Sequence, residues 1–217
     1  MTLRGFMENN KKTKYQIVKN FTASRIYAII KNSDDGARRA ILAKLRAGVG
    51  RSPAECPELW GYYLEKMPEE IAGKNQISYA EMSVYSALTL FALHQQGKSP
   101  DESPMFVRGK GIGSAIAALI KNDDDKTRIT RRFNMLASVS DFESAVQQVR
   151  SLIGMLNAES IPVDYADLAG DFYRMQFSDS IDDVRMKWGK QFYLGFETYK
   201  NNDNSKTDVK KHSKGKK

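Results

Sequence analysis

Few residues of this sequence combine the types and the spacing that bond-making chemistry needs. The most suggestive motif is the glycine-rich run RGKGIG over residues 108–113, because closely spaced glycines before a helix can point backbone N–H groups at a phosphate. The run lacks the Gly-Lys-Ser/Thr end of a Walker loop, and no strand of the kind that opens a Rossmann loop precedes it. We therefore expect these glycines to allow a tight turn and close helix packing.

The other candidates for catalysis or metal binding are isolated in the sequence. Residues 123–125 are three consecutive aspartates, whose carboxylates fan apart at a helix start and favour capping over metal binding. His94 follows an apolar stripe without an evident partner, which favours a core histidine over a general base. Cys56 is the only cysteine, and no local signature pairs it with His94 as a nucleophile. The sequence thus predicts no enzyme, no metal site and no cofactor.

Basic side chains are the more promising candidates. Residues 36–54, 104–122 and 126–140 contain no Asp or Glu, and such segregation favours contact with phosphates. The candidate nucleic-acid-binding residues are Arg38, Arg39, Lys44, Arg46, Arg51, Arg108, Lys110, Lys121, Arg128, Arg131, Arg132 and Arg150. An ordinary solvated charged face is the alternative that these stretches leave open.

The spacing of the arginines suggests how they would bind. Arg128, Arg131 and Arg132 stand at i, i+3 and i+4, so they project from one side of a helix. Arg39 and Arg46 lie two turns apart on one face of an earlier helix. No Asn or Gln accompanies them to read bases, and no helix-turn-helix signature is evident, so we expect contact with the backbone rather than with base edges.

The net charge of the chain is carried by its ends. The 217 residues include 34 Lys plus Arg against 26 Asp plus Glu, a formal net charge of +8. Residues 1–19 and 201–217 each carry a net +4, and residues 20–200 hold 23 charges of each sign. We expect both ends to be mobile and the body to be neutral with polarised faces. No apolar run reaches the length of a membrane span, and the polar start does not resemble a secretory signal, so a cytoplasmic protein is expected.

Apolar residues recur at helical spacing almost throughout, and strand-like alternation is nearly absent. The sequence therefore predicts an all-α protein. The expected helices cover residues 34–48, 59–68, 78–96, 111–121, 122–137, 141–156, 162–173 and 179–199. The helix over 78–96 is apolar on all sides, which is typical of a buried central helix.

The composition changes abruptly near residue 100. Residues 97–104 read GKSPDESP, a mixture of Pro, Gly and charge that is typical of a linker or a long surface loop. We place a domain boundary there, between an N-terminal helical subdomain over 20–98 and a C-terminal helical bundle over 105–200. Residues 201–217 are low-complexity and basic, and they are predicted to form a disordered tail.

Several sequence runs in serial order resemble one known family. The runs are AILAKLRAG over 40–48, PELW over 57–60, ALTLFALHQQ over 87–96, GIGSAIA over 111–117, RRF over 131–133, IPVDYADLA over 161–169 and VRMKWGKQFY over 184–193. Together they resemble the CasB family, the small subunit of the type I-E CRISPR surveillance complex, Cascade. The resemblance spans about residues 36–195, and its specificity lies in the order of the runs.

The resemblance implies a fold and a role. It implies an all-helical protein of two subdomains that is not catalytic and serves antiviral defence inside a crRNA-guided complex. Two copies of the subunit would pack beside the crRNA-bearing backbone subunits and the large subunit. Their basic surface would contact the target strand and the displaced DNA strand and so stabilise the R-loop. No membrane and no small-molecule substrate is implied.

The resemblance also bears on single positions. The aligned basic residues retained here are Arg46, Arg131, Arg132 and Arg150, whereas residues 47, 137 and 151 are Ala, Ala and Ser where relatives can have arginine. The acidic stretches 55–70 and 164–183 are candidate protein interfaces. The main alternative is a helical adaptor or scaffold whose tails alone bind nucleic acid. A hydrolase that uses His94 would need a pocket with a positioned partner.

Overall fold

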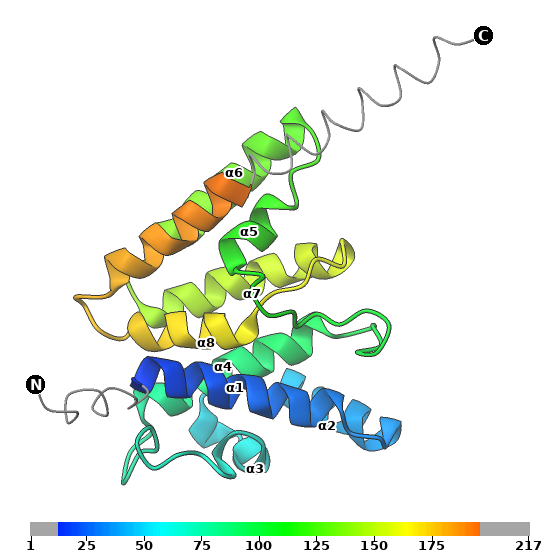
Figure 1. Cartoon of the computed structure of the whole chain (residues 1–217), viewed down its shortest axis with the longest axis vertical. Helices are drawn as coiled ribbons and strands as arrows, with labels where there is room; N and C mark the ends of the chain where they lie inside the picture. Colours follow the sequence, from blue (N-terminus) through cyan, green and yellow to red (C-terminus); the bar gives the residue numbers. More distant parts are fainter. Residues whose placement is uncertain (1–12, 196–217) are drawn as a thin grey trace, which may run out of the picture.

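The computed structural model describes residues 13–195, and within this range the chain is helical (Figure 1). The helices in chain order are α1 (Lys14–Ile30), α2 (Asp35–Ala47), the 3-10 turns η2 (Pro53–Glu55) and η3 (Pro57–Leu59), α3 (Trp60–Leu64), α4 (Tyr79–His94), α5 (Ile112–Ala117), α6 (Asp123–Ala137), α7 (Phe142–Ala158) and α8 (Tyr165–Arg174). A last helix covers residues 181–195. Within the described range the only β pairing is an isolated bridge between Phe106 and Val163. The all-α prediction is confirmed.

Polar side chains fix where these helices begin. The Asp34 carboxylate accepts the N–H of Ala37 at 2.9 Å and starts α2, and Asn122 accepts the N–H of Asp125 at 2.8 Å and starts α6. Such caps satisfy backbone donors that have no partner inside the helix. The predicted starts of both helices are therefore confirmed, and residues 123–125 form the acidic first turn of α6.

Helix α4 lies at the centre of the molecule. All of its residues except Tyr79, Met82 and Leu93 are buried, and α1, α2, α7 and α8 all pack against it. The burial of each large apolar side chain contributes about 1.5–3 kcal/mol to folding. The prediction of a buried central helix is confirmed.

Helix α1 was not expected. Residues 14–19 belong to α1, so the prediction that residues 1–19 form a mobile end is wrong for this part, and residues 1–12 lie outside the described range. α1 packs along α8, and the Lys19 ammonium pairs with the Asp167 carboxylate at 2.7 Å. Helix α1 buries Val18, Ile26 and Ile29, but the less buried Ile17, Tyr27 and Ile30 are apolar as well. Apolar residues therefore surround the helix, and its sequence shows no distinct apolar stripe.

The C-terminal part is built around α6 and the last helix, which run side by side in Figure 1. The rings of Phe133 and Phe192 stack between them at a centroid distance of 4.1 Å, and Trp188 is fully buried. Helix α5 can approach the last helix closely because Gly113 has no side chain. A Cβ at this position would overlap the carbonyl oxygen of Trp188. This contact explains one of the glycines of the 108–113 run.

The two predicted subdomains are in extensive contact. One cluster of buried apolar side chains includes residues from α1, α4, α7 and α8, and α1 and α4 pack on α8 across the predicted boundary. The division at residues 97–104 stays a prediction. The predicted tail over 201–217 lies outside the described residues. Within the described range no helix has the length and apolarity of a bilayer span.

Candidate nucleic-acid interface

One face of α2 forms the wall of a groove. Asp35, Arg38, Arg39, Leu42 and Arg46 share this face, because they follow one another at the three- and four-residue spacing of a helix. Arg46 lies near the C-terminal end of α2, where a cation also complements the helix dipole.

The opposite wall comes from the segment that follows α4. It consists of Gln95, Gly97, Lys98, Ser99 and Pro100, and the two walls enclose a cavity of about 420 Å³. The buried Gln95 amide shapes this wall, since its Nε2 donates to the carbonyl oxygens of Lys98 and Ser103, both at 3.1 Å. We call the whole feature the α2 groove. Four cations and one carboxylate line it, so its potential is positive.

The four cations of the α2 groove are held differently. Arg38 is buried and donates to the Asp35 carboxylate at 2.7 Å, and this bond raises the pKa of Arg38 and lowers that of Asp35. Arg39 pairs with the same carboxylate at 2.5 Å but stays 76% exposed. Lys98 Nζ donates to Ser160 Oγ at 2.8 Å. Arg46 has no ion pair with any described residue, so it and Arg39 are the arginines most available to a ligand.

Three more candidate cations lie beyond the α2 groove. Arg51 donates to the carbonyl oxygen of Glu55 at 2.6 Å. Arg150 of α7 places its guanidinium against Gly50, next to Arg51 in the chain. Lys44 points from α2 into solvent. The fold thus brings Arg150 beside the end of α2, a proximity that the sequence alone could not give.

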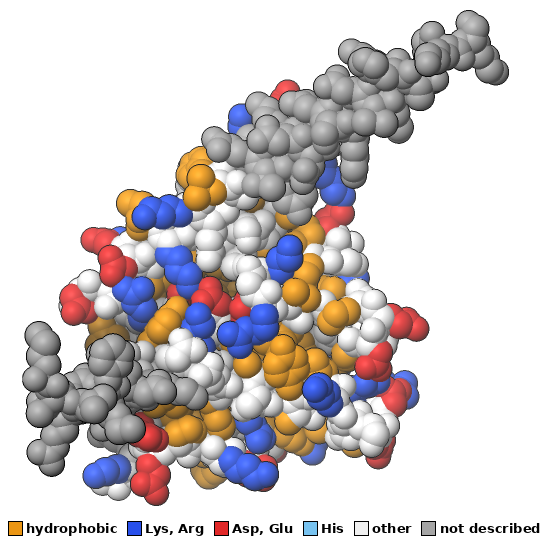
Figure 2. Space-filling view, in the orientation of Figure 1, with side chains coloured by type: hydrophobic (Ala, Val, Ile, Leu, Met, Phe, Trp, Pro, Cys, Tyr) orange, Lys and Arg blue, Asp and Glu red, His pale blue; other side chains and the backbone are white. Residues whose placement is uncertain are grey.

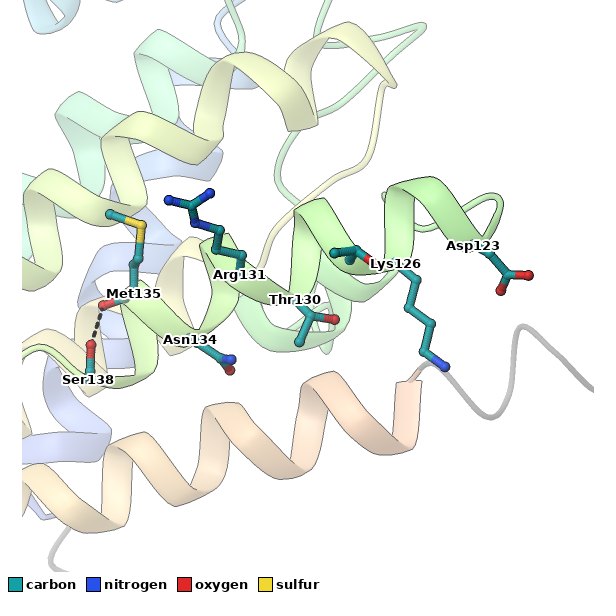
Figure 3. Close-up of a pocket in the computed structure, with 8 residues that line it drawn as sticks. Asp123, Lys126, Thr130, Arg131, Asn134, Met135 and Ser138 are labelled. Atoms are coloured by element: carbon teal, nitrogen blue, oxygen red, sulfur yellow. Dashed lines mark hydrogen bonds between the residues drawn. The ribbon is translucent and has the colours of Figure 1, made fainter.

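Helix α6 carries a second group of cations. Arg131 and Arg132 are exposed and make no ion pair within the described part of the chain. Arg128 pairs with the Asp125 carboxylate at 2.7 Å. Arg131 and Lys126 line a shallow hollow along α6, together with the polar side chains seen in Figure 3. All three arginines are exposed, and their role in binding stays a prediction.

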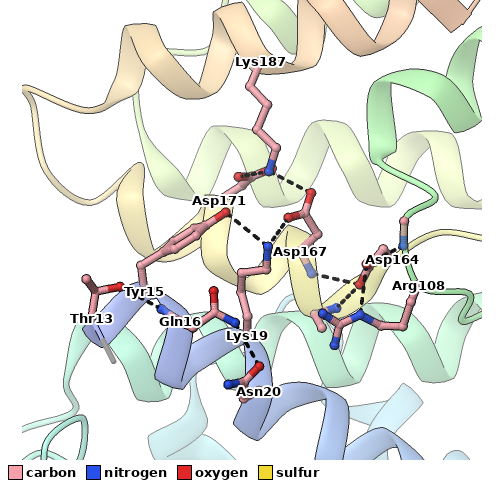
Figure 4. A network of polar contacts seen from close by, with 12 residues as sticks. Thr13, Tyr15, Gln16, Lys19, Asn20, Arg108, Asp164, Asp167, Asp171 and Lys187 are labelled. Carbon is pink, nitrogen blue, oxygen red and sulfur yellow. Dashed lines mark hydrogen bonds and ion pairs between the residues drawn. The ribbon is translucent and has the colours of Figure 1, made fainter. Parts of the chain in front are cut away.

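The remaining candidates lie around the 108–113 run. Arg108 Nε pairs with Asp164 at 3.2 Å, and the same buried carboxylate accepts the N–H of Gly109 at 2.8 Å (Figure 4). Gly109 has φ +79°, a conformation that favours glycine. This turn is therefore fastened to the start of α8, as expected for packing glycines. Lys110 is exposed, and Lys121 pairs with Glu159.

The first half of the acidic stretch over 164–183 is internal, whereas Asp179, Asp182 and Asp183 are exposed. Lys187 bridges the carboxylates of Asp167 and Asp171 at 2.7 and 2.6 Å (Figure 4), and Trp188 Nε1 donates to Asp171 at 2.8 Å. Burial raises the pKa of Asp171 to about 6. The prediction of a protein interface is therefore wrong for these three aspartates, because Asp167 and Asp171 join α8 to α1 and to the last helix, and Asp164 holds the 108–113 turn.

His94 is a core residue, as predicted. It is fully buried, and its Nδ1 lies 2.9 Å from the Tyr165 hydroxyl. Burial lowers the pKa of His94 to about 4, so the ring is neutral near pH 7. Over residues 13–195 no cluster of His, Cys, Asp or Glu has the arrangement of a metal site.

The face of the molecule seen in Figure 2 carries no single broad basic field. On the face seen in Figure 2, basic side chains alternate with acidic and apolar ones. The α2 groove is therefore a local feature, and Lys98 is the member that sequence analysis missed. The composition of residues 97–104 predicts a linker, and nothing in the sequence places Lys98 of this run next to the acid-free stretch 36–54.

The fold and this surface define a class: a small all-α protein with local basic surfaces on a rigid helical body. The family is given by comparison with known proteins. The model of the family described as CRISPR-associated protein Cse2 (CRISPR_cse2) matches residues 41–193. Because the match covers more than half of the chain, the chain belongs to the Cse2 family, and the expected relation to CasB is confirmed.

Solved structures agree with this assignment. The crystal structure of CasB from Thermobifida fusca is similar with a TM-score of 0.69 and 29% identity, over 81% of this chain and 97% of that one. A chain described as CRISPR RNA-guided surveillance complex has a TM-score of 0.64 at 18% identity, over 86% of this chain and 99% of that one. CasB from Thermus thermophilus has 0.58 at 16% identity, with 84% and 99% covered. Comparison with curated protein sequences gives no match.

Proposed function

We propose that this protein is the non-catalytic small subunit of a cytoplasmic type I-E CRISPR surveillance complex, where it binds DNA backbone without sequence preference and stabilises the R-loop in antiviral defence. Its partners are the crRNA-binding backbone subunits, the large subunit, a second copy of itself, and the target and displaced strands. One observation carries the DNA-binding part of this proposal. The α2 groove places Arg39, Arg46 and Lys98 on opposed walls with one carboxylate among them.

The physical argument concerns a balance of free energies. Exchange of a DNA duplex for an RNA–DNA hybrid of the same length is close to neutral, so a few backbone contacts are enough to tip it. Because the guide supplies the sequence specificity, the protein must tolerate any sequence, and arginines that contact phosphates meet this need. Three phosphate contacts on a single strand correspond to about 2 units of the logarithmic salt slope.

The proposed groove is tested on the full chain. We expect the triple variant Arg39→Ala, Arg46→Ala, Lys98→Ala to bind single-stranded oligonucleotides of unrelated sequence more weakly, with a salt slope reduced by about 2. The matched control is Lys14→Ala, Lys66→Ala, Lys74→Ala, which removes three exposed cations that do not line the groove. Fluorescence anisotropy over a salt series measures both. An equal loss in the two variants would assign the binding to overall charge and overturn the role of the groove.

The α6 arginines are tested in the assembled complex. We expect Arg131→Ala combined with Arg132→Ala to shorten the lifetime of the R-loop while helicity measured by circular dichroism is retained, since both side chains are exposed. An unchanged R-loop lifetime would remove these two residues from the proposed interface.

The second candidate function is that of a helical adaptor whose tails alone bind nucleic acid. The exposed apolar side chains on the last helix favour it, since Met186 and Leu194 are 60% and 63% exposed and line a common surface hollow. Large exposed apolar side chains are typical of protein interfaces. This function predicts that the groove variant binds DNA like the native chain and that removal of both ends, residues 1–12 and 196–217, abolishes binding.

A further inference from the structure

Arg38 connects three parts of the fold at the edge of the α2 groove. Its Nη1 donates to the carbonyl oxygen of Ile30 at 3.1 Å and pairs with the Asp101 carboxylate at 2.9 Å. Its Nη2 bonds Asp35 at 2.7 Å. The guanidinium therefore holds the end of α1, the start of α2 and the segment after α4 together. It also lines the α2 groove.

The hydrogen bonds of Arg38 are incomplete. Its side chain is only 10% exposed, and its Nε is buried without a hydrogen-bond partner. An unpaired buried donor costs free energy, because it has lost water without gaining an acceptor. The present partners of Arg38, which bind Nη1 and Nη2, therefore leave its Nε unpaired.

Asp101 is the partner that can leave. Its side chain is 67% exposed, and the pair with Arg38 is the one polar interaction of its carboxylate with the described residues. The backbone on either side is fastened separately, by the bonds from Gln95 to the carbonyl oxygens of Lys98 and Ser103. A rotation of the Asp101 side chain therefore releases Arg38 without disturbing the groove wall.

We propose that the α2 groove contains a phosphate-binding position in which the Asp101 carboxylate competes with a phosphate for Arg38. The inference rests on the proposed function, and it names Asp101 as the residue that limits the affinity of the α2 groove for DNA. A phosphodiester presents two anionic oxygens, as a carboxylate does, and a guanidinium can bind both through two parallel donors. The Asp101 carboxylate therefore sets a threshold of affinity that a ligand must exceed. A weakly bound anion leaves Asp101 on Arg38, whereas a phosphodiester strand that is also held by Arg39 and Arg46 displaces it.

The test uses the full chain and a charge-matched control. Asp101→Asn removes the competing charge, and we expect it to tighten binding of a fluorescent single-stranded oligonucleotide about three- to five-fold at moderate salt. Glu102→Gln removes the same charge from the neighbouring residue, which has no ion pair with any described residue. It should change the affinity clearly less. Equal effects of the two variants would overturn the competition with Asp101.

A double-mutant cycle tests whether the effect passes through Arg38. Arg38→Lys keeps the positive charge and loses the guanidinium donors, and it avoids the uncompensated carboxylates that a neutral residue would leave. We expect Asp101→Asn to give no gain in the Arg38→Lys background, because the competing pair is already weakened. A gain of the same size in both backgrounds would show that Arg38 is not the contested group.

A second arm distinguishes the sources of phosphate. Inorganic tripolyphosphate is titrated against the bound oligonucleotide for each variant. A gain for both probes supports recognition of phosphate from any source, a gain for the oligonucleotide alone supports recognition of a phosphodiester strand, and a gain for neither overturns the inference. The proposed function fails separately, if loss of Arg39, Arg46 and Lys98 leaves oligonucleotide binding unchanged.

Discussion

The buried imidazole of His94 makes the stability of this protein depend on pH in a calculable way. Burial lowers the pKa of His94 from 6.5 to about 4, so the unfolded chain binds a proton more readily than the folded one between these values. Stability is therefore complete above pH 6.5 and is lost as the pH falls. Each pKa unit corresponds to about 1.4 kcal/mol, which gives a loss of about 2 kcal/mol by pH 5 and about 3 kcal/mol near pH 4.

The assay is equilibrium urea unfolding of the native chain and of His94→Gln between pH 7.5 and 4.5. Glutamine does not titrate, so the difference between the two unfolding free energies isolates the imidazole. Burial raises the pKa of Asp171 to about 6, which makes stability fall as the pH rises through 4–6, but this contribution is common to both proteins and cancels in the difference. Parallel pH profiles would refute the reasoning.

A spectroscopic measurement gives an independent check of the same imidazole. The chain contains only two histidines, His94 and His212, so a His212→Asn variant leaves one imidazole signal for NMR. We expect that signal to stay in its neutral form until well below pH 6. A titration midpoint near 6.5 would contradict the burial of His94.

Further predictions concern the contacts that fasten the last helix. Asp171→Ala leaves the buried indole N–H of Trp188 without its acceptor and the Lys187 ammonium with Asp167 as its remaining partner, and we expect a loss of about 1–3 kcal/mol. Asp183→Ala removes a partner that is 70% exposed and should cost less than about 1 kcal/mol; urea unfolding measures both. Gly113→Ala places a methyl group on the carbonyl oxygen of Trp188, so we expect a loss of about 1–3 kcal/mol in the same assay. Gly154→Ala, in an exposed helical position with open space around it, should instead stabilise the protein by about 0.5–1 kcal/mol.

Helix positions were predictable because their determinants are local. The apolar run over 78–96 and the caps at Asp34 and Asn122 act within one or two turns, so their effect can be seen in a short window of sequence. Helix α1 escaped prediction because its stability comes from packing along α8 and from the Lys19–Asp167 pair. These residues are 148 positions apart in the chain.

The candidate interface was predictable only in part. The acid-free stretch over 36–54 identified Arg39 and Arg46 as members of one face, because helical periodicity is a local property. It did not separate them from Arg38, whose side chain is turned inward by Asp35 and Asp101. Lys98 could not be placed beside them from the sequence, since the segment after α4 meets α2 through the pair of Arg38 with Asp101, 63 positions apart in the chain.

By itself, the sequence determined the class of the fold, most of the helices, the glycine turn at 108–113 and the family. These depend on periodicity, on caps and on the order of short runs, all of which are properties of neighbouring residues. Only the tertiary structure decided which charges serve the core and which remain for a ligand. Asp167 and Asp171 became internal because Lys19 and Lys187 reach them from other helices, and a charge stays buried only where folding supplies a partner of the opposite sign.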